Sequence, residues 1–109
     1  MTESEFYDLV DRVFAVIGET LDNIDVDYDW TLREGVLEIE CPDGSKLILN
    51  RHLPNREIWL AAKSGGYHYR PKNGVWTDTR RSEALPVMLT RALHEQSGAA
   101  VEFPPLPAV

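Results

Sequence analysis

The chain has 109 residues, enough for one domain with its own core, and it carries 18 acidic side chains against 11 lysines and arginines, for a formal net charge of −7. This charge argues against nucleic acid as a partner, and no apolar run is long enough to cross a membrane. Cys41 is the only cysteine, which excludes an internal disulfide, and the N-terminus lacks the pattern of a targeting segment, so we expect a cytoplasmic protein.

The first predicted element is an amphipathic helix that begins after Thr2. Thr2 and Glu5 form the capping-box pattern that opens many helices. Apolar residues then recur every three or four positions, at Phe6, Leu9, Val10, Val13, Phe14, Ile17 and Leu21. We expect this stripe to face the core and the charged residues to face outward.

Seven carboxylates follow the outer face of this helix and the segment after it. We call them the acidic ridge: Asp8, Asp11, Glu19, Asp22, Asp25, Asp27 and Asp29. The first four fall near one line on a helix, and the last three alternate with other residues, which places them on one side of an extended segment. A single row of negative charge should therefore pass from the helix onto a strand.

The acidic ridge is informative because it costs stability. Like charges three positions apart on a helix repel by roughly 0.2–0.5 kcal/mol per pair. Glu19 and Asp22 lie at the negative end of the helix dipole, at a cost of roughly 0.3–1 kcal/mol each, and Gly18 weakens the same turn by about 1 kcal/mol relative to alanine. One interpretation is a solvated face that aids solubility. We favour a surface for a cation or a basic partner, because solubility does not require one line of like charge.

Short alternating segments, separated by turn residues, fill the middle of the chain. The predicted strands cover 26–32, 36–41, 46–51, 57–61, 67–70 and 75–78. The segments 42–45 and 71–74 have the composition of tight turns. Connections this short require antiparallel neighbours.

A second helix is predicted over 82–97, with Gly98 as its stop. The resulting fold class is α+β: a two-layer sandwich in which the N- and C-terminal helices pack on one face of an antiparallel sheet of about six strands. We expect a single domain over 1–103 and a proline-rich tail over 104–109. The other face of the sheet is then open to water or to a partner.

Alternation along the segment 57–61 sends one tryptophan to that open face. Ile58 and Leu60 need the helix-covered side, so Trp59 points the other way, together with Glu57. Tryptophan is a frequent anchor of interfaces, so we interpret Trp59 as a candidate docking residue. Mere exposure is the alternative, because single exposed apolar residues are common.

Two stretches carry a resemblance to a known family. The stretch 50–61, Asn-Arg-His-Leu-Pro-Asn-Arg-Glu-Ile-Trp-Leu-Ala, and the stretch 65–69, Gly-Gly-Tyr-His-Tyr, resemble the signature of the frataxin family, above all of its bacterial members. The resemblance extends from Ser4 through the acidic ridge to the helix after Ser82. It implies two helices against an antiparallel sheet, in agreement with the prediction from the residues.

The resemblance also implies a function. Frataxins bind iron weakly, act in iron–sulfur cluster assembly as iron-responsive regulators or iron carriers, and dock on the cysteine desulfurase and the scaffold protein. For this chain it implies ferrous or ferric iron, a monomer that iron can drive into oligomers, and a bacterial cytoplasm. The implied metal positions are Asp11, Glu19, Asp22, Asp25, Asp27 and Asp29. We add Asp8 because it lies on the same line of the predicted helix as Asp11, Glu19 and Asp22. The implied partner positions are Asp11, Glu19, Asp22, Asn50, Arg51 and Trp59.

The chain departs from the family pattern at several positions. His52 and Glu57 stand where glutamine is common, and Gly18 and Asn23 where bacterial members often have acidic residues. The ridge should therefore bind fewer or weaker cations, and His52 could add a ligand or change partner contacts.

Carboxylate oxygens suit hard cations such as iron, magnesium and calcium. A convex, solvated row offers no fixed cage, so affinities on the order of micromolar or weaker are expected. No catalytic motif indicates an enzyme, although slow iron oxidation at the ridge stays open. The alternative function is a metal-independent acidic module that binds a basic protein.

Overall fold

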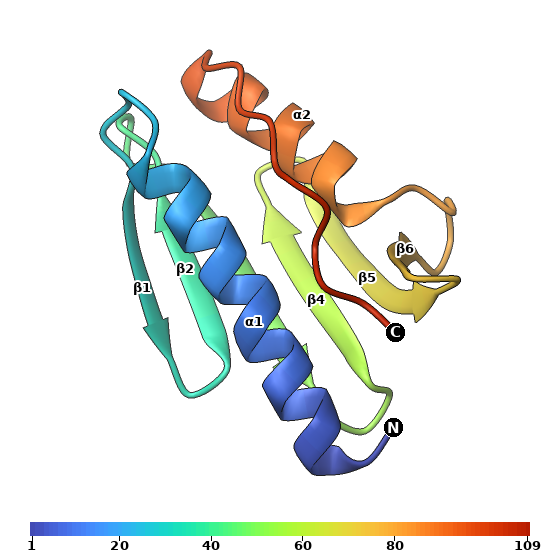
Figure 1. Cartoon of the computed structure of the whole chain (residues 1–109). Coiled ribbons are helices and arrows are strands. Elements are labelled where there is room, and N and C mark those ends of the chain that lie inside the picture. The colour runs from blue at the N-terminus through green and yellow to red at the C-terminus, as the bar shows by residue number, and fades with distance from the viewer.

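The computed structural model describes residues 1–109 and consists of two helices and one sheet (Figure 1). The elements in chain order are α1 (Glu3–Asp22), β1 (Asp29–Arg33), β2 (Val36–Glu40), β3 (Lys46–His52), β4 (Glu57–Ala62), β5 (Gly65–Lys72), β6 (Val75–Asp78) and α2 (Leu85–Ser97). The six strands lie side by side in chain order, and each is antiparallel to the next. The predicted α+β sandwich is confirmed.

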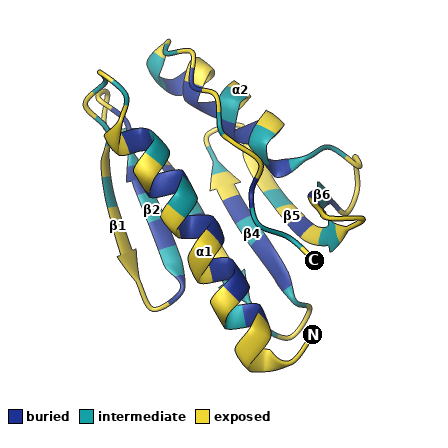
Figure 2. Ribbon diagram, viewed as in Figure 1, coloured by how far each residue is buried: buried dark blue, intermediate teal, exposed yellow.

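The helix α1 forms as its sequence pattern predicts. Thr2 Oγ1 accepts a hydrogen bond from the Glu5 N–H at 3.1 Å, and Glu5 Oε1 accepts one from the Thr2 N–H at 2.8 Å, which completes the capping box. The apolar stripe from Phe6 to Leu21 is buried. The opposite side of α1 is exposed along its length (Figure 2).

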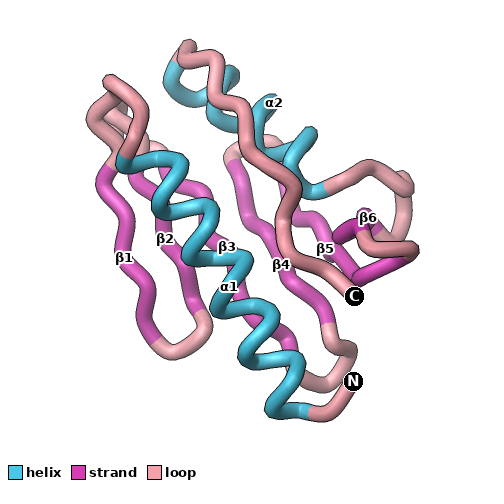
Figure 3. Tube along the Cα trace, in the orientation of Figure 1, coloured by secondary structure: helices cyan, strands magenta, loops and turns pink.

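Both helices cover the same face of the sheet (Figure 3). The side chains that the strands send toward α1 and α2 are fully or almost fully buried, among them Leu37, Ile39, Leu47, Leu49, Ile58 and Leu60. The alternate residues of each strand point to the other side, which no helix covers. We call that side the open face. Neither helix combines the length and the hydropathy that a bilayer-spanning helix needs.

The C-terminal segment after α2 packs onto the core. Val101 is fully buried, Leu106 is 8% exposed, and the Trp76 indole N–H donates to the carbonyl oxygen of Pro107 at 2.6 Å. In Figure 1 this segment, drawn in red, runs back along α2 toward the end of the molecule where α1 begins. Residues 104–109 are thereby tied to β6 through the indole of Trp76.

The first strand starts three residues later than predicted. Residues 24–26 bend, and the Tyr28 N–H donates to the Val26 carbonyl at 2.9 Å, so this stretch turns back on itself before β1 begins at Asp29. The alternation of exposed and half-buried side chains continues through the bend, which is why the sequence resembled a longer strand.

The second helix also starts three residues later than predicted, at Leu85. Ser82 has a positive φ of 58°, which a helix cannot contain, and Ala84 forms an isolated antiparallel bridge with Thr77, which keeps the chain extended up to the N-cap. The predicted stop is confirmed, because Gly98 caps the helix in the left-handed conformation with φ 74°.

Candidate functional site

The structure places the acidic ridge on the outer side of α1 and on the loop that follows. The four helical members are exposed opposite the buried stripe of α1, Asp25 and Asp27 are exposed in the loop, and Asp29 opens β1. Trp30 contacts α1, so by alternation Asp29 points to the open face. The predicted strand carries only the last of the three aspartates, because residues 24–26 bend and leave Asp25 and Asp27 in the loop before β1.

One contact joins the end of α1 to β1. The Trp30 indole N–H donates to Asp22 Oδ1 at 2.8 Å, and the indole lies directly on Gly18. A Cβ at position 18 would come within 2.6 Å of the Trp30 ring, so only glycine permits this approach. The helix-weakening effect of Gly18 is visible in the sequence, but its cause is not, because Trp30 lies on another element.

A second contact gives the ridge a cation. Arg51 reaches from β3 to Asp11, with 3.9 Å between Nη1 and Oδ1, and its guanidinium lies 3.8 Å over the centre of the Tyr7 ring. Gly35 makes room for it, since a Cβ there would stand 2.7 Å from the guanidinium carbon. Arg51 therefore belongs to the edge of the ridge, on the helix side of the sheet.

The ridge carboxylates do not converge on one point. No group of three or more His, Cys, Asp or Glu side chains in the chain is close enough to hold a metal ion. The donors themselves are hard oxygens that suit iron. The residues thus fit a cation held by one or two carboxylates and completed by water, and they do not form a chelating cage.

The open face is dominated by a stack of three rings. Trp59 on β4 is opposite Asn50 on β3 and His68 on β5 in the strand register. The His52 ring lies on one face of the indole at 3.7 Å between centres, and the His68 ring lies on the other at 4.2 Å, both nearly parallel to it. Trp59 is consequently half-buried and held in place, with both faces of its indole covered.

Glu57 holds the indole of Trp59 in this stack through a hydrogen bond. Its side chain is 4% exposed, and it accepts hydrogen bonds from the Trp59 indole N–H at 2.9 Å and from Arg70 Nη2 at 2.6 Å. Burial opposes the negative charge, but these two hydrogen bonds and the charge of Arg70 outweigh it and hold the pKa of Glu57 below its usual value. Glu57 thus lies on the open face as predicted, although the stack buries it.

The ring stack is what sequence reasoning missed. Sequence reasoning gave His52 a possible role as a metal ligand or in partner contacts, but its imidazole covers one face of Trp59, and the His68 imidazole covers the other. His52 Nδ1 is buried without a hydrogen-bond partner. The signal that could have revealed the stack is parity, since Trp59, His52 and His68 all point to the open face once the hairpin register is known.

Comparison with known proteins agrees with this architecture. The family model of the frataxin-like domain matches residues 1–99. The chain belongs to the frataxin family. A protein of Neisseria meningitidis serogroup C, named iron–sulfur cluster assembly protein CyaY, is 46% identical over 103 residues, which cover 94% of this chain and 96% of the relative. A protein of the same name from Pseudomonas aeruginosa is 43% identical over 108 residues, which cover 97% of this chain and 100% of the relative.

Solved frataxin structures share the fold. Frataxin from Psychromonas ingrahamii superposes with a TM-score of 0.90 at 34% identity, over 95% of this chain and 99% of that one. Trimeric frataxin from Saccharomyces cerevisiae, complexed with ferrous iron, superposes with a TM-score of 0.68 at 27% identity, over 91% and 88% of the two chains. The family resemblance seen in the sequence is confirmed.

Proposed function

We propose that this chain acts in bacterial, cytoplasmic iron–sulfur cluster assembly, where it binds iron weakly at the acidic ridge and docks on the cysteine desulfurase and its scaffold. The pathway is supported by the two bacterial relatives named as iron–sulfur cluster assembly proteins. Iron is supported by the ferrous complex of the yeast relative. The observation that carries the binding mode is a row of seven exposed carboxylates without a metal cage.

Weak binding has a direct consequence for the role. A cation held by one or two carboxylates and water exchanges readily, so the ridge suits a carrier or a sensor better than a store. The same carboxylates complement a basic groove on a partner and speed its approach. Iron and partner then share the ridge, which makes the interaction respond to iron.

The proposed partner positions fall on two surfaces. Asp11, Glu19 and Asp22 belong to the ridge, and Arg51 lies beside Asp11 on the same side of the sheet. Asn50 and Trp59 neighbour each other on the open face. We assign the ridge to electrostatic attraction and Trp59 to the apolar contact, because a fixed aromatic ring loses little conformational entropy on docking.

An anaerobic ferrous titration followed by amide NMR tests the iron site, with magnesium as the control cation. Ferrous iron should broaden the amides of the ridge at ratios where magnesium has little effect. The variant Asp25→Asn/Asp27→Asn should weaken the effect, and the matched variant Glu95→Gln/Glu102→Gln, which removes two exposed carboxylates outside the ridge, should not. If iron acts only as magnesium does, the metal role is wrong.

The alternative is a metal-independent acidic module, and one observation favours it. Two exposed ridge carboxylates already have a partner within the chain, which reduces what they offer a cation: Asp22 accepts a hydrogen bond from Trp30, and Asp11 lies 3.9 Å from Arg51. Binding to the purified desulfurase, measured with and without iron, separates the two functions. If the affinity for the desulfurase is the same with and without iron but falls after Asp25→Lys/Asp27→Lys, the metal-independent module is supported.

Two further measurements during the iron titration test the remaining expectations. Oxygen consumption reports on iron oxidation, and sedimentation reports on the formation of oligomers.

A further inference from the structure

The β5–β6 end of the open face contains a polar hollow. It has a volume of about 230 Å³ and is lined by seven residues, none of them hydrophobic. Lys72 comes from the end of β5, Thr77 from β6, and Thr79 and Ser82 from the segment that leads to α2. A smaller hollow of about 110 Å³ adjoins it, shares Asp78 and Thr79, and adds Arg80.

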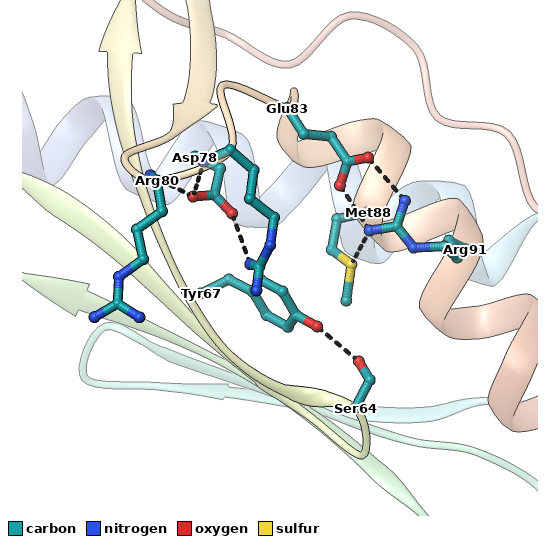
Figure 4. A network of polar contacts seen from close by, with 8 residues as sticks. Ser64, Tyr67, Asp78, Arg80, Glu83, Met88 and Arg91 are labelled. Carbon is teal, nitrogen blue, oxygen red and sulfur yellow. Dashed lines mark hydrogen bonds and ion pairs between the residues drawn. The ribbon is translucent and has the colours of Figure 1, made fainter.

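The one carboxylate in the wall, that of Asp78, is paired with donors inside the fold. Asp78 is 3% exposed, and its side chain accepts hydrogen bonds from the backbone N–H groups of Arg80 at 2.7 Å and Arg81 at 3.1 Å. Arg81 Nη1 adds an ion pair at 3.4 Å (Figure 4). Burial opposes the charge, but these donors outweigh it and keep the pKa of Asp78 below its usual value. Asp78 therefore stays ionised and orders the loop, and the positive charge of Arg81 compensates its negative charge.

The cations around the hollow are less fully paired. Arg70 is bound to Glu57, but no carboxylate lies within 4.0 Å of the amino group of Lys72 or the guanidinium of Arg80. Figure 4 shows the Arg80 side chain extending away from Asp78. In a protein of net charge −7, this end of the sheet thus offers two free cations beside exposed hydroxyl groups.

The backbone in this region is held in an unusual conformation. Ser82 has a φ of 58°, in the left-handed region that serine rarely adopts, and its N–H donates to the Asp78 carbonyl at 3.0 Å. The loop centred on Asp78 fixes this conformation, which places Ser82 in the wall of the hollow. Backbone strain that the fold maintains is frequent at binding sites.

We propose that this hollow binds a phosphate group, free or carried by a small molecule, through Lys72, Thr79 and Ser82, with Arg80 in the adjoining smaller hollow. Donors from the end of β5 and from the segment before α2 can surround a tetrahedral dianion, whereas a planar carboxylate engages fewer of them. The hollow is larger than one phosphate, so it leaves room for an attached group. The site is separate from the acidic ridge and does not depend on the proposed role in cluster assembly.

Titration of the ¹⁵N-labelled full chain with inorganic phosphate at constant ionic strength tests the proposal. The amides of Thr77, Thr79 and Ser82 should shift with a dissociation constant on the order of 1 mM, as expected of a few charge-assisted contacts at an exposed site. Lys72→Gln should weaken binding about tenfold, as should Thr79→Val. The matched variants Arg33→Gln and Thr31→Val, at exposed positions on β1, should leave the affinity unchanged.

Parallel titrations with glycerol phosphate and acetate complete the test. Tighter binding of glycerol phosphate than of phosphate identifies a phosphorylated small molecule as the ligand class, and the reverse order identifies free phosphate. Equal shifts with acetate overturn the proposal. So does equal weakening by Lys72→Gln and Arg33→Gln, which would show a general charge effect. All of these variants are at exposed positions, so loss of folding does not obscure the result.

Discussion

Replacing Gly18 by alanine should destabilise the protein, although alanine is the better helix former. The added Cβ would stand 2.6 Å from Cζ2 and 2.8 Å from Cη2 of Trp30, closer than carbon atoms can approach. The gain in helix propensity is about 1 kcal/mol. Against it stands overpacking, at about 1–3 kcal/mol. Displacing the indole also breaks its hydrogen bond to Asp22, worth about 0.5–1.5 kcal/mol. The net loss should be about 0.5–3.5 kcal/mol.

A double-mutant cycle separates these terms. Urea unfolding gives the free energy of unfolding for wild type, Gly18→Ala, Trp30→Leu and the double variant. Without the indole the clash is gone, so Gly18→Ala should stabilise the Trp30→Leu background by up to about 1 kcal/mol. The effect of one substitution thus changes sign with the background. If Gly18→Ala stabilises the wild type, or acts equally in both backgrounds, the contact does not explain the glycine.

Three further outcomes follow from the packing and the charges. Glu57→Gln should lower stability at neutral pH by about 1–2 kcal/mol, and the difference should vanish in acid. The reason is that the pKa of Glu57 is lower in the folded than in the unfolded chain, where it is about 4.3. The ionised carboxylate therefore stabilises the fold at pH values above about 4.3, and this stabilisation is lost as the pH falls through the folded pKa. Chemical unfolding measured as a function of pH tests this. Raising NaCl from about 0.01 M to about 0.1 M shortens the Debye length from about 30 Å to about 10 Å. That change should raise Tm in calorimetry, because it screens repulsion within the acidic ridge. Removing residues 104–109 takes away the buried Leu106 side chain and the carbonyl that accepts the Trp76 N–H. The free energy of unfolding in urea should fall by about 2–3 kcal/mol, and an unchanged midpoint would contradict the observed packing.

The sequence predicted most of the fold because local signals agreed with each other. The capping box at Thr2, the apolar stripe of α1, the turn composition between strands and Gly98 each act within a few residues. Such signals do not depend on distant parts of the chain. The six strands and two helices, and the side of the sheet on which Trp59 lies, were therefore predictable.

What failed depended on contacts between distant residues. Apolar and acidic residues alternate through the bend before β1 as they would along a strand, so the sequence pattern did not reveal the bend. The stretch before α2 has ordinary helix formers, but Thr77 and Asp78 on β6 hold it extended. Likewise the value of Gly18 depends on Trp30. A single sequence shows the unusual residue but not the side chain that requires it.

The candidate site was predicted by residue type, while its geometry was not. Every carboxylate of the acidic ridge is exposed as expected, yet only Asp29 lies on a strand, because the chain bends at residues 24–26. The ring stack combines β3, β4 and β5, and its members are up to sixteen positions apart in the chain. Its two imidazoles come together only when the hairpin register is fixed.

The layered arrangement limits how one partner can use both proposed surfaces. The helical carboxylates of the ridge lie on the covered side of the sheet, whereas Trp59 lies on the open face. A flat partner cannot cover both. Asp29 is the only ridge carboxylate on the sheet itself, and it points to the open face at the edge strand β1. A single partner must therefore wrap around β1, or two partners must occupy the two sides. In either arrangement the edge that separates the two surfaces is held to α1 by the Trp30 indole, which packs on Gly18 and donates a hydrogen bond to Asp22.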